Sequence, residues 1–186
     1  MSINLKKGNS FNLTKNEPGL KKIMLGVGWE FSSSSIVDID VSAFMIDSTG
    51  KIPDESFFVF YNNLKSPDGG FQHMGDNRTG KGEGDDELLL ASLKLIDQRV
   101  TEIVVMVTIH EAKTRRQTFG LLKDAYIRLY DVETEREILR YDLDAEFSNS
   151  TEVEFGRLQR IDGEWRFFAS GVGSSIGLEG VLNLFV

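Results

Sequence analysis

The stretch EIVVMVTIH, residues 102–110, decides the fold class of this chain. Its apolar residues alternate with a spacing of two, which is typical of one face of a β-strand: Ile103, Val105, Val107 and Ile109. Val104 and Met106 make the opposite face apolar as well. Because a strand that is apolar on both faces must be covered on both sides, we expect it at the centre of a sheet.

Similar patterns extend outward from this strand in both directions. Period-two alternation or strand-like composition recurs in seven further segments, residues 21–29, 57–61, 86–90, 125–131, 136–143, 153–161 and 164–170. Turn signals rich in Asp, Ser and Gly separate some of them, at residues 47–51, 66–70 and 160–165. The pair Asp162-Gly163 lies between two strand patterns and predicts a hairpin.

Helical patterns are few in this chain. Residues 110–120 predict one or two helical turns between strands, and residues 175–185 predict a short C-terminal helix packed on the sheet. Many short strands with frequent turns favour an all-β fold, a β-sandwich of two mainly antiparallel sheets with short helical segments. No repeat or linker interrupts the pattern, so we expect a single domain over residues 1–186.

Composition restricts the possible functions. The chain of 186 residues has 29 acidic and 21 basic residues, a formal net charge of −8, which disfavours nucleic acid and anionic membrane surfaces as partners. It contains no cysteine, which excludes disulfides, thiolate metal sites and cysteine nucleophiles. The N-terminal residues 1–13 lack the apolar core of a signal peptide, and no apolar run is long enough for a transmembrane segment. We therefore expect a cytoplasmic protein.

The acidic loop GDNRTGKGEGDDE, residues 75–87, combines like charges with flexible glycines. Such a loop is difficult to order unless a cation compensates its charge. Its oxygen donors suit calcium, which takes six to eight oxygen ligands: Asp76, Asn77, Glu83, Asp85, Asp86 and Glu87. Its glycines allow backbone carbonyls to turn inward. Magnesium is less suitable because it requires strict octahedral geometry, and zinc because there are no cysteines and only two histidines. The alternative is a solvated loop that holds no ion.

A second acidic pair lies upstream, in the stretch IVDIDVSAF at residues 36–44. Asp38 and Asp40 alternate with apolar residues, so both carboxylates lie on one face of a predicted strand. The pair could complete the cation site at the mouth of a sandwich, but exposed strand residues are also commonly charged.

Other motif interpretations fail. Residues 75–82 nearly match a phosphate-binding P-loop, but Gly82 replaces the required Ser or Thr and Asp76 would repel phosphate. An EF-hand is excluded because Arg78 occupies the third loop position. His73 and His110 are the two candidate catalytic bases, but the sequence has no serine nucleophile in a recognisable turn to accompany them. We interpret the basic residues of the segment 113–116 as a solvated face.

Four segments together resemble the TerD-domain family of tellurium-resistance and stress-response proteins: residues 38–44, 59–70, 75–87 and 107–120. The resemblance covers practically the whole chain. It implies a bacterial cytosolic β-sandwich that binds calcium, usually at two adjacent sites, and has no established catalytic activity. The implied ligands are Asp76, Asn77, Gly82, Gly84, Asp85, Asp86 and Glu87, with Asp38 and Asp40 as the acidic strand near the site.

Two positions depart from the family pattern. Glu30 stands where the family usually has Asp, and Met74 stands where a polar residue commonly precedes the loop. Neither removes the acidic residues of the loop.

The expected function is therefore a calcium-binding, non-enzymatic module of the response to tellurite and other chemical stress. Its expected partners are calcium ions and other stress-response proteins at the membrane periphery. One alternative is a metal-dependent phosphoester hydrolase that uses the same acidic cluster. A second alternative is a structural adaptor that binds partners through the faces of the sandwich.

Overall fold

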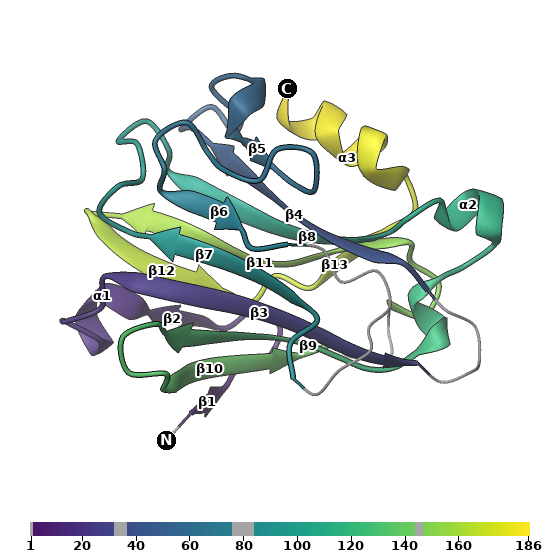
Figure 1. The fold of residues 1–186 in the computed structure, drawn as a ribbon, viewed down its shortest axis with the longest axis horizontal. Coiled ribbons are helices and arrows are strands. Elements are labelled where there is room, and N and C mark those ends of the chain that lie inside the picture. The colour runs from purple at the N-terminus through teal and green to yellow at the C-terminus, as the bar shows by residue number, and fades with distance from the viewer. Residues whose placement is uncertain (1, 32–36, 76–83, 144–146) are drawn as a thin grey trace.

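The computed structural model describes residues 2–31, 37–75, 84–143 and 147–186, which form two stacked sheets (Figure 1). Within these residues the first sheet has six strands in the order β1 (Ile3–Asn4), β10 (Glu137–Asp142), β9 (Leu122–Asp131), β3 (Lys22–Phe31), β7 (Glu87–Ser92) and β6 (Phe71–His73). The second has the order β2 (Ser10–Asn12), β12 (Glu164–Phe168), β11 (Glu152–Ile161), β8 (Glu102–Ile109), β4 (Ile39–Ile46) and β5 (Phe58–Val59), with β13 (Val172–Ser174) paired to β11. The described pairings are antiparallel except for β1 with β10. The predicted β-sandwich is confirmed.

The central position predicted for the strand at residues 102–110 is also confirmed. β8 pairs with β11 on one side and β4 on the other, and its residues from Ile103 to Ile109 are buried. Phe44 of β4 lies opposite Val104, and its ring centre is 4.7 Å from that of Phe185 in helix α3 (Gly177–Phe185). The C-terminal helix therefore covers the face of the sheet that does not contact the other sheet.

The remaining helices are short. α2 (Ala112–Arg115) and the 3₁₀ turn η2 (Phe119–Leu121) occupy the segment in which helical turns are predicted, and a second 3₁₀ turn, η1 (Glu55–Phe57), precedes β5. The sequence analysis does not predict α1 (Leu13–Asn16). This helix begins where the side chain of Asn12 accepts a hydrogen bond from the backbone N–H of Lys15 at 2.9 Å. No helix of the described residues is long and apolar enough to cross a membrane.

The hairpin between β11 and β12 shows why the predicted turn residues are used there. Ile161 pairs with Glu164, so Asp162 and Gly163 alone make the turn, and both have positive φ, 54° and 80°. Two consecutive left-handed residues define a type I′ turn, which matches the twist of the adjoining strands.

This geometry predicts that Gly163→Ala lowers the free energy of unfolding by about 1–2 kcal/mol, the cost of a left-handed conformation for a residue with a Cβ. Urea denaturation measures the change. Gly19→Ala is the matched control, because Gly19 lacks a positive φ and has open space where a Cβ would be. Equal effects of the two substitutions would contradict the assignment of the turn.

The strands place several candidate residues at one end of the sandwich. β3 ends there and β7 begins there, since Val27 pairs with Glu87, and β4 begins at the same end of the second sheet (Figure 1). The acidic run therefore enters the first sheet beside β3.

Candidate functional site

Only part of the predicted cation loop belongs to the described structure. Asp76, Asn77 and Gly82 lie outside the described residues, and Gly84, Asp85, Asp86 and Glu87 lie within them. Gly84 has a φ of +105°, a conformation that favours glycine, and Glu87 is the first residue of β7. The carboxylates at 85, 86 and 87 have different environments.

Asp85 lies against the outer face of the first sheet and is paired with Arg128 of β9. Arg128 donates two hydrogen bonds to this carboxylate, from Nε to Oδ1 at 2.7 Å and from Nη2 to Oδ2 at 2.9 Å. The Tyr126 hydroxyl donates a third, to Oδ1 at 3.1 Å. The side chain of Asp85 is only 5% exposed. A bidentate, charge-assisted contact of this kind is among the stronger polar interactions in proteins.

The pKa values of the partners reflect this cluster. The hydrogen bond to Asp85 raises the pKa of Arg128, so its positive charge is permanent. Burial, followed by the charge of Asp85, raises the pKa of Tyr126 to about 12, so its hydroxyl keeps the proton that it donates. Arg128 and Tyr126 therefore keep the same charge states across the physiological pH range.

Asp86 lies in a different environment. Its Oδ2 accepts a hydrogen bond from the backbone N–H of Trp29 at 2.9 Å, and its own N–H donates to the carbonyl of Val27 at 2.8 Å. Burial raises the pKa of this carboxyl group, the Trp29 hydrogen bond lowers it, and the charge of Asp85 raises it further. Asp86 also lines a polar hollow of about 470 Å³ with Trp29, Glu30, Gly84, Asp124, Tyr126 and Arg140.

Glu87 is buried with a histidine. Its Oε2 lies 3.2 Å from Nε2 of His73, and the two side chains are 1% and 2% exposed. His73 Nδ1 accepts a hydrogen bond from the backbone N–H of Gly75 at 3.2 Å, so in the neutral ring the proton is on Nε2, facing Glu87. This contact joins the end of β6 to the start of β7, which are the two ends of the acidic loop.

Asp38 and Asp40 belong to a different part of the sandwich from the acidic run. Asp40 lies in β4 of the second sheet, with its Oδ2 3.3 Å from Nδ1 of His110. It lines a hollow of about 770 Å³ between α2 and the start of α3, and Asp86 lines another. Oδ1 of Asp38 is buried without a hydrogen-bond partner among the described residues. The structure therefore places Asp40 and Asp86 at separate hollows.

The described residues fit a calcium site only in part. No three His, Asp or Glu residues of the described chain lie close enough together to hold a metal ion. The donors near Asp86 are hard oxygens, which suit calcium, and its partly desolvated carboxylate is a suitable ligand. Asp85 does not fit, because three donors from Arg128 and Tyr126 already occupy its oxygens. A complete site needs ligands from residues 76–83, which the structure does not describe.

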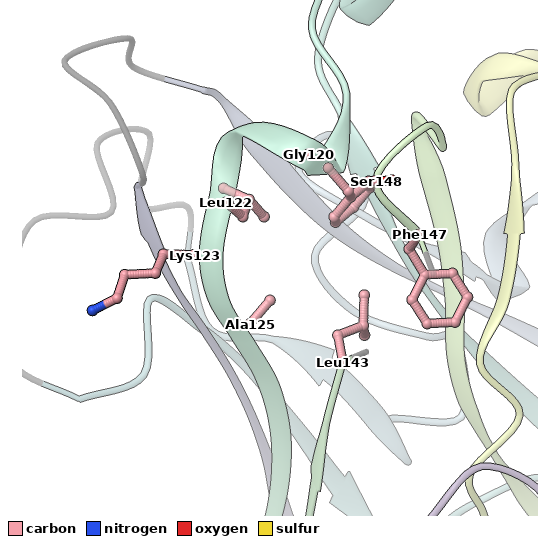
Figure 2. A pocket seen from close by; sticks show the side chains of 8 residues that line it. Gly120, Leu122, Lys123, Ala125, Leu143, Phe147 and Ser148 are labelled. Carbon is pink, nitrogen blue, oxygen red and sulfur yellow. The ribbon is translucent and has the colours of Figure 1, made fainter. Parts of the chain in front are cut away.

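A smaller pocket of about 190 Å³ lies beside the start of β9 (Figure 2). Its lining includes the apolar side chains of Leu122, Leu143 and Phe147 and the polar Ser148. Lys123 extends away from the other labelled side chains (Figure 2). Its lining offers no carboxylate, so this pocket is not a candidate cation site.

Sequence analysis does not identify several residues that build the acidic site. Arg128 and Tyr126 are recognised there only as part of a strand pattern, although they hold Asp85. Gly26 and Gly28 make room on β3: a Cβ at Gly26 would lie 2.1 Å from Oδ2 of Asp85, and one at Gly28 would lie 2.5 Å from the Tyr126 ring. Alternating glycines in an apolar strand are a signal of such a close approach.

The fold and the site together define a β-sandwich protein with an acidic loop anchored on one sheet. The family model described as the TerD domain matches residues 1–185, and the chain belongs to this family. It is 45% identical over 183 residues to a tellurium resistance protein TerD of Serratia marcescens, covering 97% of this chain and 95% of that protein. It is 41% identical to general stress protein 16U of Bacillus subtilis (strain 168), covering 96% and 94%.

Comparison with solved structures agrees with this assignment at the level of the fold. The crystal structure of a Streptomyces coelicolor homologue of a telluride resistance protein (TerD) superposes with a TM-score of 0.71. The match covers 90% of this chain and 96% of that chain, at 21% identity. At this identity the likeness shows a shared fold.

Proposed function

We propose that this chain is a non-enzymatic, calcium-binding protein of the cellular response to tellurite and other chemical stress. Relatives named for tellurium resistance and for general stress support the stress role. Calcium would bind the acidic loop, with Asp86 among its ligands, and the ordered loop would present a surface to a partner protein. The protein would act in the cytoplasm.

The main observation in support of calcium binding is the position of Asp86. This carboxylate is half-buried at the start of a strand that pairs with the core strand β3, and it faces a polar hollow shared with two further carboxylates, Glu30 and Asp124. Burial disfavours the charged form of the Asp86 carboxylate, and a divalent cation in the hollow would favour it. Calcium suits an all-oxygen donor set.

Calorimetric titration of chelator-stripped protein with calcium tests the proposal. We expect saturable binding of one or two ions per chain, and weaker binding of magnesium. Thermal unfolding gives an independent measurement: calcium at about 100 times its dissociation constant should add about 2.7 kcal/mol to the free energy of unfolding. Identical unfolding with calcium, magnesium and chelator would refute calcium binding.

The proposal that the protein is not an enzyme requires a separate test. We expect no phosphodiesterase turnover above background with magnesium, manganese or calcium present. Turnover that disappears in Asp86→Asn would instead favour the metal-dependent hydrolase.

A further inference from the structure

We propose that Asp85 is the anchor of the acidic loop and not a calcium ligand, with Arg128 as its permanent counter-ion. The part of this inference that concerns calcium rests on the proposed function, whereas the anchoring role stands on geometry alone. It divides the consecutive carboxylates of the loop into different roles, so that Asp85 holds the chain to the sheet and Asp86 lines the hollow in which a cation would bind.

Both carboxylate oxygens of Asp85 already accept hydrogen bonds. Oδ1 accepts from both Nε of Arg128 and the Tyr126 hydroxyl, and Oδ2 accepts from Nη2 of Arg128. Oδ2 also lies close to the backbone of Gly26, since a Cβ on that residue would be only 2.1 Å from this oxygen. A calcium ion would have to displace a bidentate arginine and then lie beside its positive charge.

The outer face of the first sheet has both the space and the partners that hold the Asp85 carboxylate. Gly26 and Gly28 remove two side chains from the outer face of β3, leaving space for Asp85 and for the ring of Tyr126. Glu137 of β10 holds the far side of Arg128, with Oε2 3.3 Å from Nη1. Arg140 stacks on the Tyr126 ring, with its guanidinium carbon 3.8 Å from the ring centre. Three strands of one sheet therefore contribute to the anchor.

Holding Asp85 against the sheet also positions the next residue, Asp86. Backbone contacts with β3 continue directly after Asp85, through the hydrogen bonds of Asp86 to Val27 and Trp29. Holding Asp85 on the outer face of the sheet thus fixes the position of the backbone from which the Asp86 side chain extends into its hollow. An anchor of this kind would tighten calcium binding without touching the ion.

Arg128→Gln gives the decisive test, because the two roles of Asp85 predict opposite signs. If Asp85 is an anchor, the variant loosens the loop, and calcium affinity falls by about 10- to 100-fold, the range for residues that orient ligands. If Asp85 is a ligand, removal of its competing cation makes calcium bind more tightly. Lys22→Gln is the matched control, since it removes an exposed positive charge from β3 outside the anchor and leaves the bonds of Asp85 in place.

Asp85→Asn and the double variant complete the calorimetric test. We expect the number of calcium ions bound per chain to stay the same in Asp85→Asn, and the double variant to be no weaker than the single variants. Loss of one bound ion in Asp85→Asn, or tighter binding in Arg128→Gln than in Lys22→Gln, would overturn the assignment of Asp85.

A steric test in chelator separates the anchor from the proposed function. Gly26→Ala should lower the unfolding temperature, because the new Cβ displaces the Asp85 carboxylate. In an Asp85→Ala background the same substitution should have a much smaller effect, since the displaced atoms are absent. Additive effects would refute the anchor, whereas an absence of calcium binding to the wild type would refute the proposed function alone.

Discussion

Glu152→Ala is expected to lower the free energy of unfolding by about 2–4 kcal/mol, because it leaves several buried donors without an acceptor. Glu152 is the first residue of β11 and is 1% exposed, and its carboxylate contacts the N-terminus of α3. Its Oε1 accepts hydrogen bonds from the backbone N–H groups of Ile176 and Gly177 and from the Ser174 hydroxyl. The carboxylate also faces the positive end of the helix dipole. Urea denaturation followed by circular dichroism measures the loss.

Two further variants isolate the cause of this loss. Glu179→Ala removes an exposed carboxylate from the first turn of the same helix, and we expect it to cost less than about 1 kcal/mol. Glu152→Gln keeps an acceptor without the charge and should lie between the two. Hydrogen exchange should show the amides of α3 losing protection in Glu152→Ala before those of β8. Equal losses in Glu152→Ala and Glu179→Ala would show that the capping contacts contribute nothing.

Local periodicity was sufficient to predict the strands of this fold, because burial imposes the period directly on the sequence. Residues 102–110 are apolar on both faces, and the residues of β8 from Ile103 to Ile109 are all buried. The turn at Asp162-Gly163 was predictable for a similar reason, since few residues tolerate two consecutive left-handed conformations. Helix α1 escaped prediction because four residues are too short for a helical period to appear.

The polar partners of the site were not predictable in the same way. Asp85 and Arg128 are 43 residues apart, and they meet because β3 lies between β7 and β9 in the sheet. Strand order and register arise from the whole fold, so no local pattern encodes this contact. For the same reason, the sequence placed Asp38 and Asp40 on one strand face and could not show that this strand belongs to the other sheet.

Asp86→Asn is expected to separate stability from calcium binding. The pKa of Asp86 is raised in the folded protein, chiefly by burial, so the folded state holds a proton there more readily than the unfolded chain does. Ionisation of Asp86 therefore opposes folding. The stability that the protonated carboxyl group contributes is lost as the pH rises through the folded-state pKa. In chelator at neutral pH, the variant should be at least as stable as the wild type, because an asparagine oxygen can still accept from Trp29. This advantage should disappear as the pH falls and Asp86 becomes protonated.

Calcium should reverse the order of stability of these two proteins. At about 100 times the wild-type dissociation constant, the wild type gains about 2.7 kcal/mol and a variant that has lost the ion gains nothing. Glu133→Gln is the matched control, because it removes one exposed negative charge from the turn between β9 and β10 and should keep the calcium response. Thermal unfolding of the three proteins with calcium and with chelator, at several pH values, makes the comparison. A full calcium response in Asp86→Asn would remove Asp86 from the ligand set.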